Sequence, residues 1–91
     1  MRKFVIEREI PGIGGADSNQ VRDIARKSNG IVETLGGDLE WLESYIAGDK
    51  VYCVYLAKDE AVIRKHAEKG GFPANRIAEV KRMMDPTSAL A

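Results

Sequence analysis

Hydrophobic and polar positions alternate with a period of two near the start of the chain. In the run KFVIEREI the apolar row consists of Phe4, Ile6 and Ile10, and Arg8 interrupts it. This alternation predicts a β-strand over residues 3–10, because successive side chains of a strand point to opposite faces. The run RIAEVKRMM alternates in the same way and predicts a last strand over residues 76–84.

Two other segments repeat their apolar residues at helical spacing. The first predicts a helix over about residues 18–35, where Asp17 and Gln20 have the spacing of a capping box. The second predicts a helix over about residues 60–69 with Asp59 as its N-cap. Glycine follows each segment, which is typical of a helix C-terminus.

The segment between the helices predicts a β-hairpin. Residues 38–58 contain two β-rich runs joined by AGDK. The resulting order βαββαβ is typical of the ferredoxin-like α+β sandwich, a four-stranded antiparallel sheet with two helices on one face. We therefore expect a single ferredoxin-like domain over residues 1–84 and a C-terminal tail over residues 85–91.

Because the helices cover one face of such a sheet, the other face is open in a monomer. The alternation places seven side chains under the helices: Phe4, Ile6, Leu42, Val54, Leu56, Ala78 and Val80. It places ten on the open face: Val5, Glu7, Trp41, Glu43, Tyr45, Cys53, Tyr55, Ile77, Glu79 and Lys81. Such a mixture predicts a homodimer, an α/β-barrel-like assembly in which two sheets enclose a pocket.

That pocket is a candidate functional site. Its predicted members are three aromatic residues, three carboxylates and one thiol: Glu7, Trp41, Glu43, Tyr45, Cys53, Tyr55 and Glu79. Carboxylates buried together at an interface raise one another's pKa and can act as an acid or a base. Ion pairing of Glu7, Glu43 and Glu79 with Arg8 and Lys81 across the sheet, and packing of the aromatic residues in the interface, are the simpler alternatives.

Composition excludes several classes of partner. Fourteen basic residues balance 14 acidic ones in this 91-residue chain, so no net charge attracts nucleic acid or an anionic membrane. No apolar run approaches the roughly 20 residues of a membrane helix, and the start MRKFVIERE lacks the apolar core of a signal peptide. We expect a cytoplasmic protein, and one cysteine leaves no intramolecular disulfide.

The glycine-rich loop PGIGGADS lies between a predicted strand and a predicted helix, as a phosphate-binding turn does. Its spacing argues against that role. The position of a third glycine in GxGxxG is occupied by Asp17, whose carboxylate would repel an anion. A turn followed by an N-cap is the better interpretation.

Cys53 and His66 are the single thiol and the single imidazole of the chain. A nucleophile and base must lie within hydrogen-bond reach, but the predicted faces put Cys53 on the open side and the helix of His66 on the other. Cys53 is predicted to be a small core residue. His66 is a structural histidine, an acid or base, or a ligand, with carboxylates, of a divalent metal such as nickel, cobalt or zinc.

Several motifs together resemble a known family. They are FVIEREIPG over residues 4–12, the W-x-x-S-Y of Trp41, Ser44 and Tyr45, DKVYCVYLA over 49–57, HAEKGGFPANRIAEV over 66–80, and Asp85-Pro86. In this combination the chain resembles a small bacterial family of nickel-binding-protein-like domains of unknown function. The resemblance implies a ferredoxin-like subunit that dimerises through its sheets, and nickel bound at the dimer surface in a relative. The resemblance also implies that many members have a histidine at the position of Glu43, so this chain lacks an imidazole there with which relatives could bind nickel.

The sequence thus leaves three hypotheses. The first is a cytoplasmic homodimeric binding protein that holds nickel or another divalent transition metal through His66 and carries no organic cofactor. The second is a small cofactor-independent enzyme, using an open-face carboxylate and an aromatic-lined dimer pocket for a small apolar ligand. The third is a structural module that binds a partner protein through a flat, dry sheet face.

Overall fold

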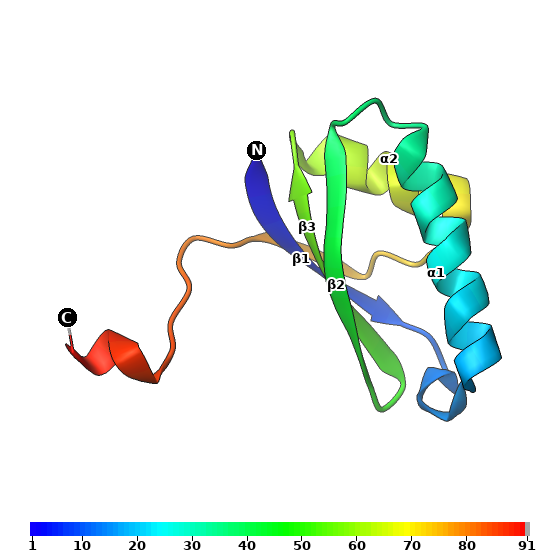
Figure 1. Ribbon diagram of the computed structural model, residues 1–91, viewed down its shortest axis with the longest axis horizontal. Coiled ribbons are helices and arrows are strands. Elements are labelled where there is room, and N and C mark those ends of the chain that lie inside the picture. Colours follow the sequence, from blue (N-terminus) through cyan, green and yellow to red (C-terminus); the bar gives the residue numbers. More distant parts are fainter. Residues whose placement is uncertain (91) are drawn as a thin grey trace.

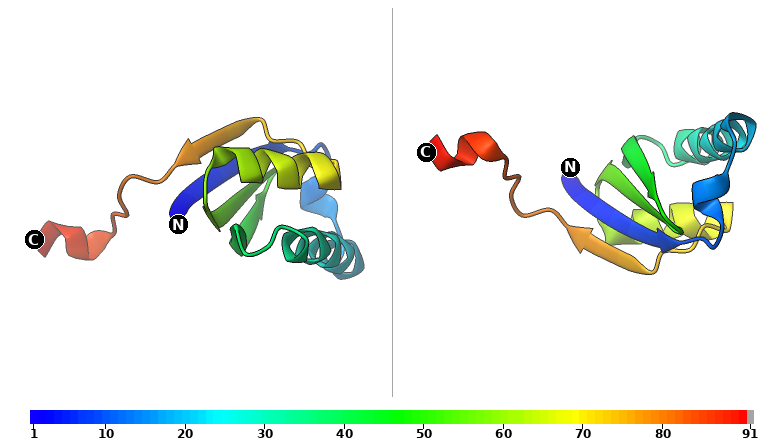
Figure 2. Two further views of the ribbon diagram at one scale, coloured as in Figure 1. Left: turned by 90° about the horizontal axis from the view of Figure 1, so that it is seen from above. Right: turned by 90° about the horizontal axis from the view of Figure 1, so that it is seen from below.

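A computed structural model describes residues 1–90 of the chain. Its elements follow one another in the order β1 (Arg2–Glu9), η1 (Ile13–Gly15), α1 (Ser18–Glu33), β2 (Leu39–Ala47), β3 (Lys50–Ala57), α2 (Glu60–Gly70), β4 (Arg76–Glu79) and η2 (Pro86–Leu90). The strands form one antiparallel sheet in the order β2-β3-β1-β4. Both helices lie on the same side of this sheet (Figure 1), and Figure 2 shows them next to each other from above and below. The predicted ferredoxin-like α+β fold is confirmed.

The helices begin where their capping residues predict. Asp17 accepts a hydrogen bond from the backbone N–H of Gln20, and the Gln20 side chain accepts one from the backbone N–H of Asp17, both at 2.8 Å. Asp59 caps α2 through the N–H of Val62 at 3.0 Å. At the other end of α2, Gly71 has φ 66°, a left-handed conformation that favours glycine. No helix within residues 1–90 is long and apolar enough to span a membrane.

The last strand is shorter than its alternation predicts. β4 ends at Glu79, and after one further backbone bond, from Val80 to Lys3, the chain leaves the sheet. The segment that follows extends away from the domain as far as η2 (Figure 1). Ala91, the last residue of the predicted tail, lies outside the described residues.

The predicted face of β3 is wrong. Cys53 pairs with Ile6 and Tyr55 pairs with Phe4, and all four side chains are buried under the helices. Val54, predicted to be covered, instead pairs with Val5 on the uncovered face, and Leu56 follows the same alternation. Both rows of β3 are largely apolar, so alternation alone identifies a strand without identifying its buried side.

A β-bulge in β2 changes which of its side chains face the helices, so the predicted faces of this strand are partly wrong. The register shifts between Trp41 and Glu43, so Trp41 lies opposite Tyr55 on the covered face while Glu43 lies opposite Val54 on the uncovered one. Tyr45 remains on the uncovered face, and Leu42, predicted to be buried, is 43% exposed. An extra residue in one strand reverses the alternation beyond it, and the period-two pattern did not anticipate this.

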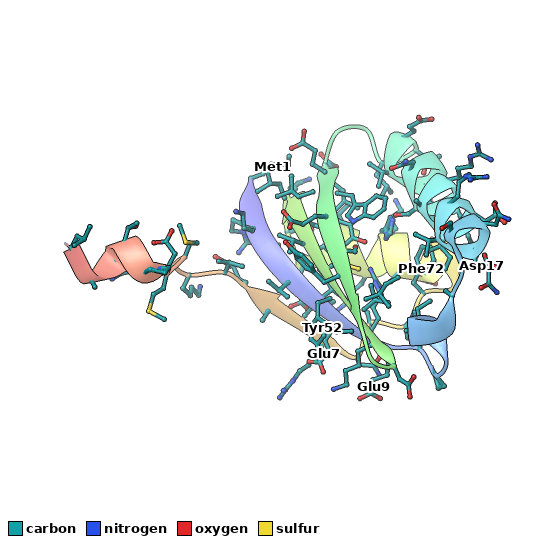
Figure 3. The ribbon with its side chains drawn as sticks, turned by 60° about the horizontal axis from the view of Figure 1, so that its bottom comes forward. Met1, Glu7, Glu9, Asp17, Tyr52 and Phe72 are labelled. Atoms are coloured by element: carbon teal, nitrogen blue, oxygen red, sulfur yellow. The ribbon has the colours of Figure 1, made fainter. Side chains whose placement is uncertain are left out.

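The faces of β4 are reversed as well. Ile77 pairs with Ile6 and Glu79 pairs with Phe4, so both belong to the covered side, and Ala78 belongs to the uncovered one. Of the open-face residues predicted in β1, Val5 and Glu7 are correctly placed. Figure 3 shows Glu7 and Tyr52 projecting from the side of the sheet away from the helices, whereas Phe72 lies among the helices.

The glycine-rich loop packs against the hairpin between β2 and β3. A Cβ on Gly14 would lie 2.5 Å from the carbonyl oxygen of Gly48. Asp49 joins the two segments, since its backbone oxygen accepts from Ile10 N–H at 2.9 Å and its side chain accepts from Gly12 N–H at 3.2 Å. These contacts support the interpretation of PGIGG as a packing turn.

Candidate functional site: a cavity with a buried arginine

A cavity of about 160 Å³ lies between α1 and the covered face of the sheet. The apolar stripe of α1 forms one wall with Val21, Ile24 and Ala25, and the sheet and η1 form the others. Val21 is 40% exposed and Ile24 is 42% exposed, although both face the sheet. α1 therefore stands away from the strands, and its apolar stripe is left without full packing partners.

Arg8 is the charged group of the cavity wall, and it is only 3% exposed. Its Nη1 donates to the carbonyl oxygen of Pro73 at 2.7 Å, its Nη2 to the hydroxyl of Tyr55 at 3.2 Å, and its Nε to the sulfur of Cys53 at 3.5 Å. The guanidinium carbon lies 5.5 Å from the ring centre of Phe72. None of these partners is a carboxylate.

Among residues 1–90, no carboxylate forms an ion pair with Arg8. The ion pairs within residues 1–90 join Arg2 and Lys81 to Glu79, Lys50 to Glu7, and Arg64 to Glu60. Removing a cation from water costs on the order of several kcal/mol unless an opposite charge compensates it. A buried arginine without a paired carboxylate is therefore costly to the fold, and this cost indicates a functional role for Arg8.

Tyr55 lies beside Arg8 and stays a protonated phenol. Burial raises its pKa to about 12, the neighbouring Cys53 adds to this effect, and the charge of Arg8 opposes it. Its oxygen accepts from Arg8, and a side-chain hydrogen bond with Cys53 also helps to keep the phenol protonated. The cavity thus combines a cation and a protonated phenol with apolar walls.

His66 is 1% exposed, and its ring packs against the rings of Tyr55 and Phe72. Its ring stacks on Phe72 at 5.6 Å between centroids, and its Nε2 lies 3.2 Å from the hydroxyl oxygen of Ser28. Burial lowers the pKa of His66 below its usual 6.5, and the charge of Arg8 lowers it further. The imidazole is therefore neutral at pH 7, and its Nδ1 has no hydrogen-bond partner within residues 1–90.

Cys53 and His66 belong to one buried polar cluster, contrary to the predicted separation of their faces. Arg8 and Tyr55 connect them: Arg8 contacts the Cys53 sulfur, and the Tyr55 ring lies 5.5 Å from the His66 ring. We call this set, with Ser28, the Arg8 cluster. Its hydrogen bonds join β1 to β3 and α1 to α2, and the contact between the Tyr55 and His66 rings links the two pairs on the covered side of the sheet.

The predicted open-face pocket is not assembled within one chain. Trp41, Cys53 and Tyr55 contribute to the cavity on the covered side. Glu7 bonds to Lys50 at 2.6 Å, which lowers its pKa, whereas the enzyme hypothesis expects a carboxylate with a raised pKa. Glu79 is paired with Arg2 at 2.9 Å. Glu43 and Tyr45 are exposed on the uncovered side.

Three members of the observed site were not singled out as site residues from the sequence: Arg8, Ser28 and Phe72. Arg8 carried a usable signal, because it continues the buried row of Phe4 and Ile6 and is the position where that row changes from apolar to charged. Ser28 and Phe72 carried none, since a serine within a helix and an aromatic residue after one are common in any domain.

The described residues of one chain do not form a metal site. No three side chains among the histidine, cysteine, aspartate and glutamate residues of 1–90 lie close enough to share an ion. His66 offers an unpartnered nitrogen, but a stable transition-metal site needs further ligands. A single chain therefore does not fit a closed nickel centre.

Comparison with known proteins places these features in a family. Residues 4–80 match the family model described as "Nickel responsive protein SCO4226-like". The crystal structure of SCO4226 from Streptomyces coelicolor A3(2) is similar to this one, with a TM-score of 0.73 and 17% sequence identity over 90% of this chain and 99% of that chain. At this identity the structural likeness shows a shared fold. No curated protein sequence matches the chain.

Proposed function

The chain belongs to the SCO4226-like family of nickel responsive proteins, and we propose that within this family it is a binding protein for a small organic ligand. The proposed binding site is the cavity between α1 and the sheet. The observation that carries this proposal is Arg8, a buried cation on an apolar cavity wall with no carboxylate beside it among residues 1–90. Ligand pockets typically combine apolar walls with a few fixed polar groups.

The indole of Trp41 provides a direct assay. It is the only tryptophan of the chain, it lies on the cavity wall, and its Nε1 donates to Ser44 at 2.9 Å. We expect toluene, a neutral probe that fits the apolar walls, to change its fluorescence in a saturable way. The variant Ala25→Leu places extra atoms in the cavity and should weaken toluene binding.

Asn29→Leu is the matched control, because Asn29 is an exposed position of the same helix outside the cavity. It should bind toluene as the unmodified protein does. Toluene binding that fails to saturate, or that Ala25→Leu leaves unchanged while the fold is intact by circular dichroism, would contradict the proposed site.

A second candidate function is association with nickel or another divalent transition metal through His66 in a homodimer. The family description and the unpartnered Nδ1 of a neutral imidazole support it, because a metal binds the neutral ring. The described residues of one chain lack the other ligands, and His66 is 1% exposed on the covered side, opposite the sheet face at which we expect a second copy. Metal binding would therefore require α2 to open and expose the ring to ligands from outside residues 1–90. Calorimetric titration of tag-free protein with nickel, cobalt and zinc tests it beside His66→Gln. Saturable heat that is lost in the variant supports the candidate, and its absence in the unmodified protein excludes it.

A further inference from the structure

We propose that the ligand of the cavity is a small monocarboxylate with a compact apolar body, whose carboxylate pairs with Arg8. This inference rests on the proposed function and adds the chemical class of the ligand. Benzoate represents the class: one planar anionic group attached to an apolar ring.

The positive charge of Arg8 on the cavity wall favours an anionic ligand. Arg8 is 3% exposed, and its three bonded partners are the carbonyl of Pro73, the hydroxyl of Tyr55 and the sulfur of Cys53. Lys27 is exposed and does not line the cavity, so Arg8 is the one cation of the wall among residues 1–90. A bound monoanion would neutralise the guanidinium and remove most of the cost of its burial.

The remaining donors suit a carboxylate. A guanidinium has five N–H groups, and three of those of Arg8 are used in the bonds above. Two N–H groups remain, and a carboxylate has two oxygens that accept from an arginine fork. A phosphate dianion would need more positive charge than this wall provides.

The rest of the cavity suits an apolar body of limited size. Its walls include Ile13, Ala25, Trp41 and Val51, which offer no charge. An apolar cavity of about 150 Å³ accommodates benzene, and this cavity has a volume of about 160 Å³. A ligand of roughly the size of benzoate therefore fills it, whereas a nucleotide or a long acyl chain does not fit.

The cavity also has an entrance. Val21, Ile24 and Ile46 line it, and each is 40 to 43% exposed. These side chains come from α1 and β2, so the opening lies between the helix and the edge strand. A small ligand can enter there without unfolding an element.

The test compares benzoate with benzamide at pH 7 on the full chain, with Trp41 fluorescence and calorimetry as readouts. The two probes have nearly the same shape, and only benzoate carries a charge. We expect benzoate to bind about ten to a hundred times more tightly, the range that a charge-assisted hydrogen bond provides. In Arg8→Gln this preference should disappear while toluene still binds. Arg64→Gln, which removes an exposed arginine of α2, is the control and should keep it.

The possible outcomes are distinguishable. Equal binding of benzoate and benzamide, together with saturable toluene binding, would overturn the carboxylate inference and leave the ligand-binding function standing. Binding of none of the three probes would overturn both. The comparison of benzoate with benzamide uses the unmodified protein, so it decides the matter even if Arg8→Gln fails to fold.

Discussion

Arg8 and Tyr55 lie side by side on the covered face of the sheet, with Nη2 of the arginine donating to the tyrosine oxygen at 3.2 Å. β1 supplies the first and β3 the second, and both side chains are at most 3% exposed. The pair puts a permanent cation and a phenol that stays protonated on the wall of an apolar cavity.

The stability of the protein should fall as the pH drops below 6.5, because of His66. Burial and Arg8 lower the pKa of His66 in the folded state. The unfolded chain therefore takes up a proton near pH 6.5, while the folded chain does not. The stability that comes from the neutral imidazole is fully present above pH 6.5 and is lost as the pH falls. The free energy of unfolding then decreases by up to about 1.4 kcal/mol per pH unit.

Urea denaturation between pH 5.5 and 7.5 measures this slope. His66 is the single histidine of the chain, so His66→Gln should flatten the profile in this range. An unchanged profile in the variant would show that other groups are responsible.

The phenol of Tyr55 should ionise only in strong alkali. Burial raises the pKa of Tyr55 to about 12, so its phenolate should be absent from the ultraviolet difference spectrum at pH 10.5. The variant Tyr55→Phe should remove the late step of the titration and leave the earlier part unchanged. If the variant instead loses part of the absorbance change below pH 10.5, then Tyr55 is accessible to water, which would contradict its burial on the cavity wall.

Much of the fold could be predicted because capping, turn and alternation signals agree along the chain. Asp17 and Asp59 begin their helices as expected, and the hairpin turns at Gly48. The faces of β2 and β3 could not be predicted, for two physical reasons. β3 is apolar on both sides, and the bulge after Trp41 inverts the alternation of β2 without a sequence signal.

Gly14 should tolerate no side chain. A Cβ there would lie 2.5 Å from the carbonyl of Gly48, and a backbone atom of a hairpin turn cannot move aside easily. We expect Gly14→Ala to lower the free energy of unfolding by about 1 to 3 kcal/mol. Gly15→Ala is the control, because nothing lies within 4 Å of its added Cβ, and it should stay within about 0.5 kcal/mol. Equal urea midpoints for the two variants would contradict the packing described for this loop.

The uncovered face of the sheet should hold a second copy of the chain. Val5, Val54 and Leu56 are half-buried there, and no helix within residues 1–90 covers them. Light scattering should give twice the 10.0 kDa of one chain. Val54→Glu should produce a monomer, whereas Ala61→Glu, on the exposed side of α2, should remain dimeric. A monomeric mass for the unmodified protein would exclude the dimer.

The candidate site was less predictable than the fold, because it depends on side chains that meet across four elements. Cys53 and His66 attracted attention as rare residue types, and the wrong face of β3 separated them. Arg8 appeared to be a flaw in an apolar row, and its importance follows from burial and from the absence of a nearby carboxylate among residues 1–90. Neither property can be read from residue order.

The most direct test of the account is a crystal structure of the full chain grown with benzoate. If the cavity binds monocarboxylates, the aromatic ring should lie between α1 and the sheet, with the carboxylate within hydrogen-bond distance of the Arg8 guanidinium. Benzoate bound elsewhere, or an empty cavity at a concentration that saturates the fluorescence change, would contradict it.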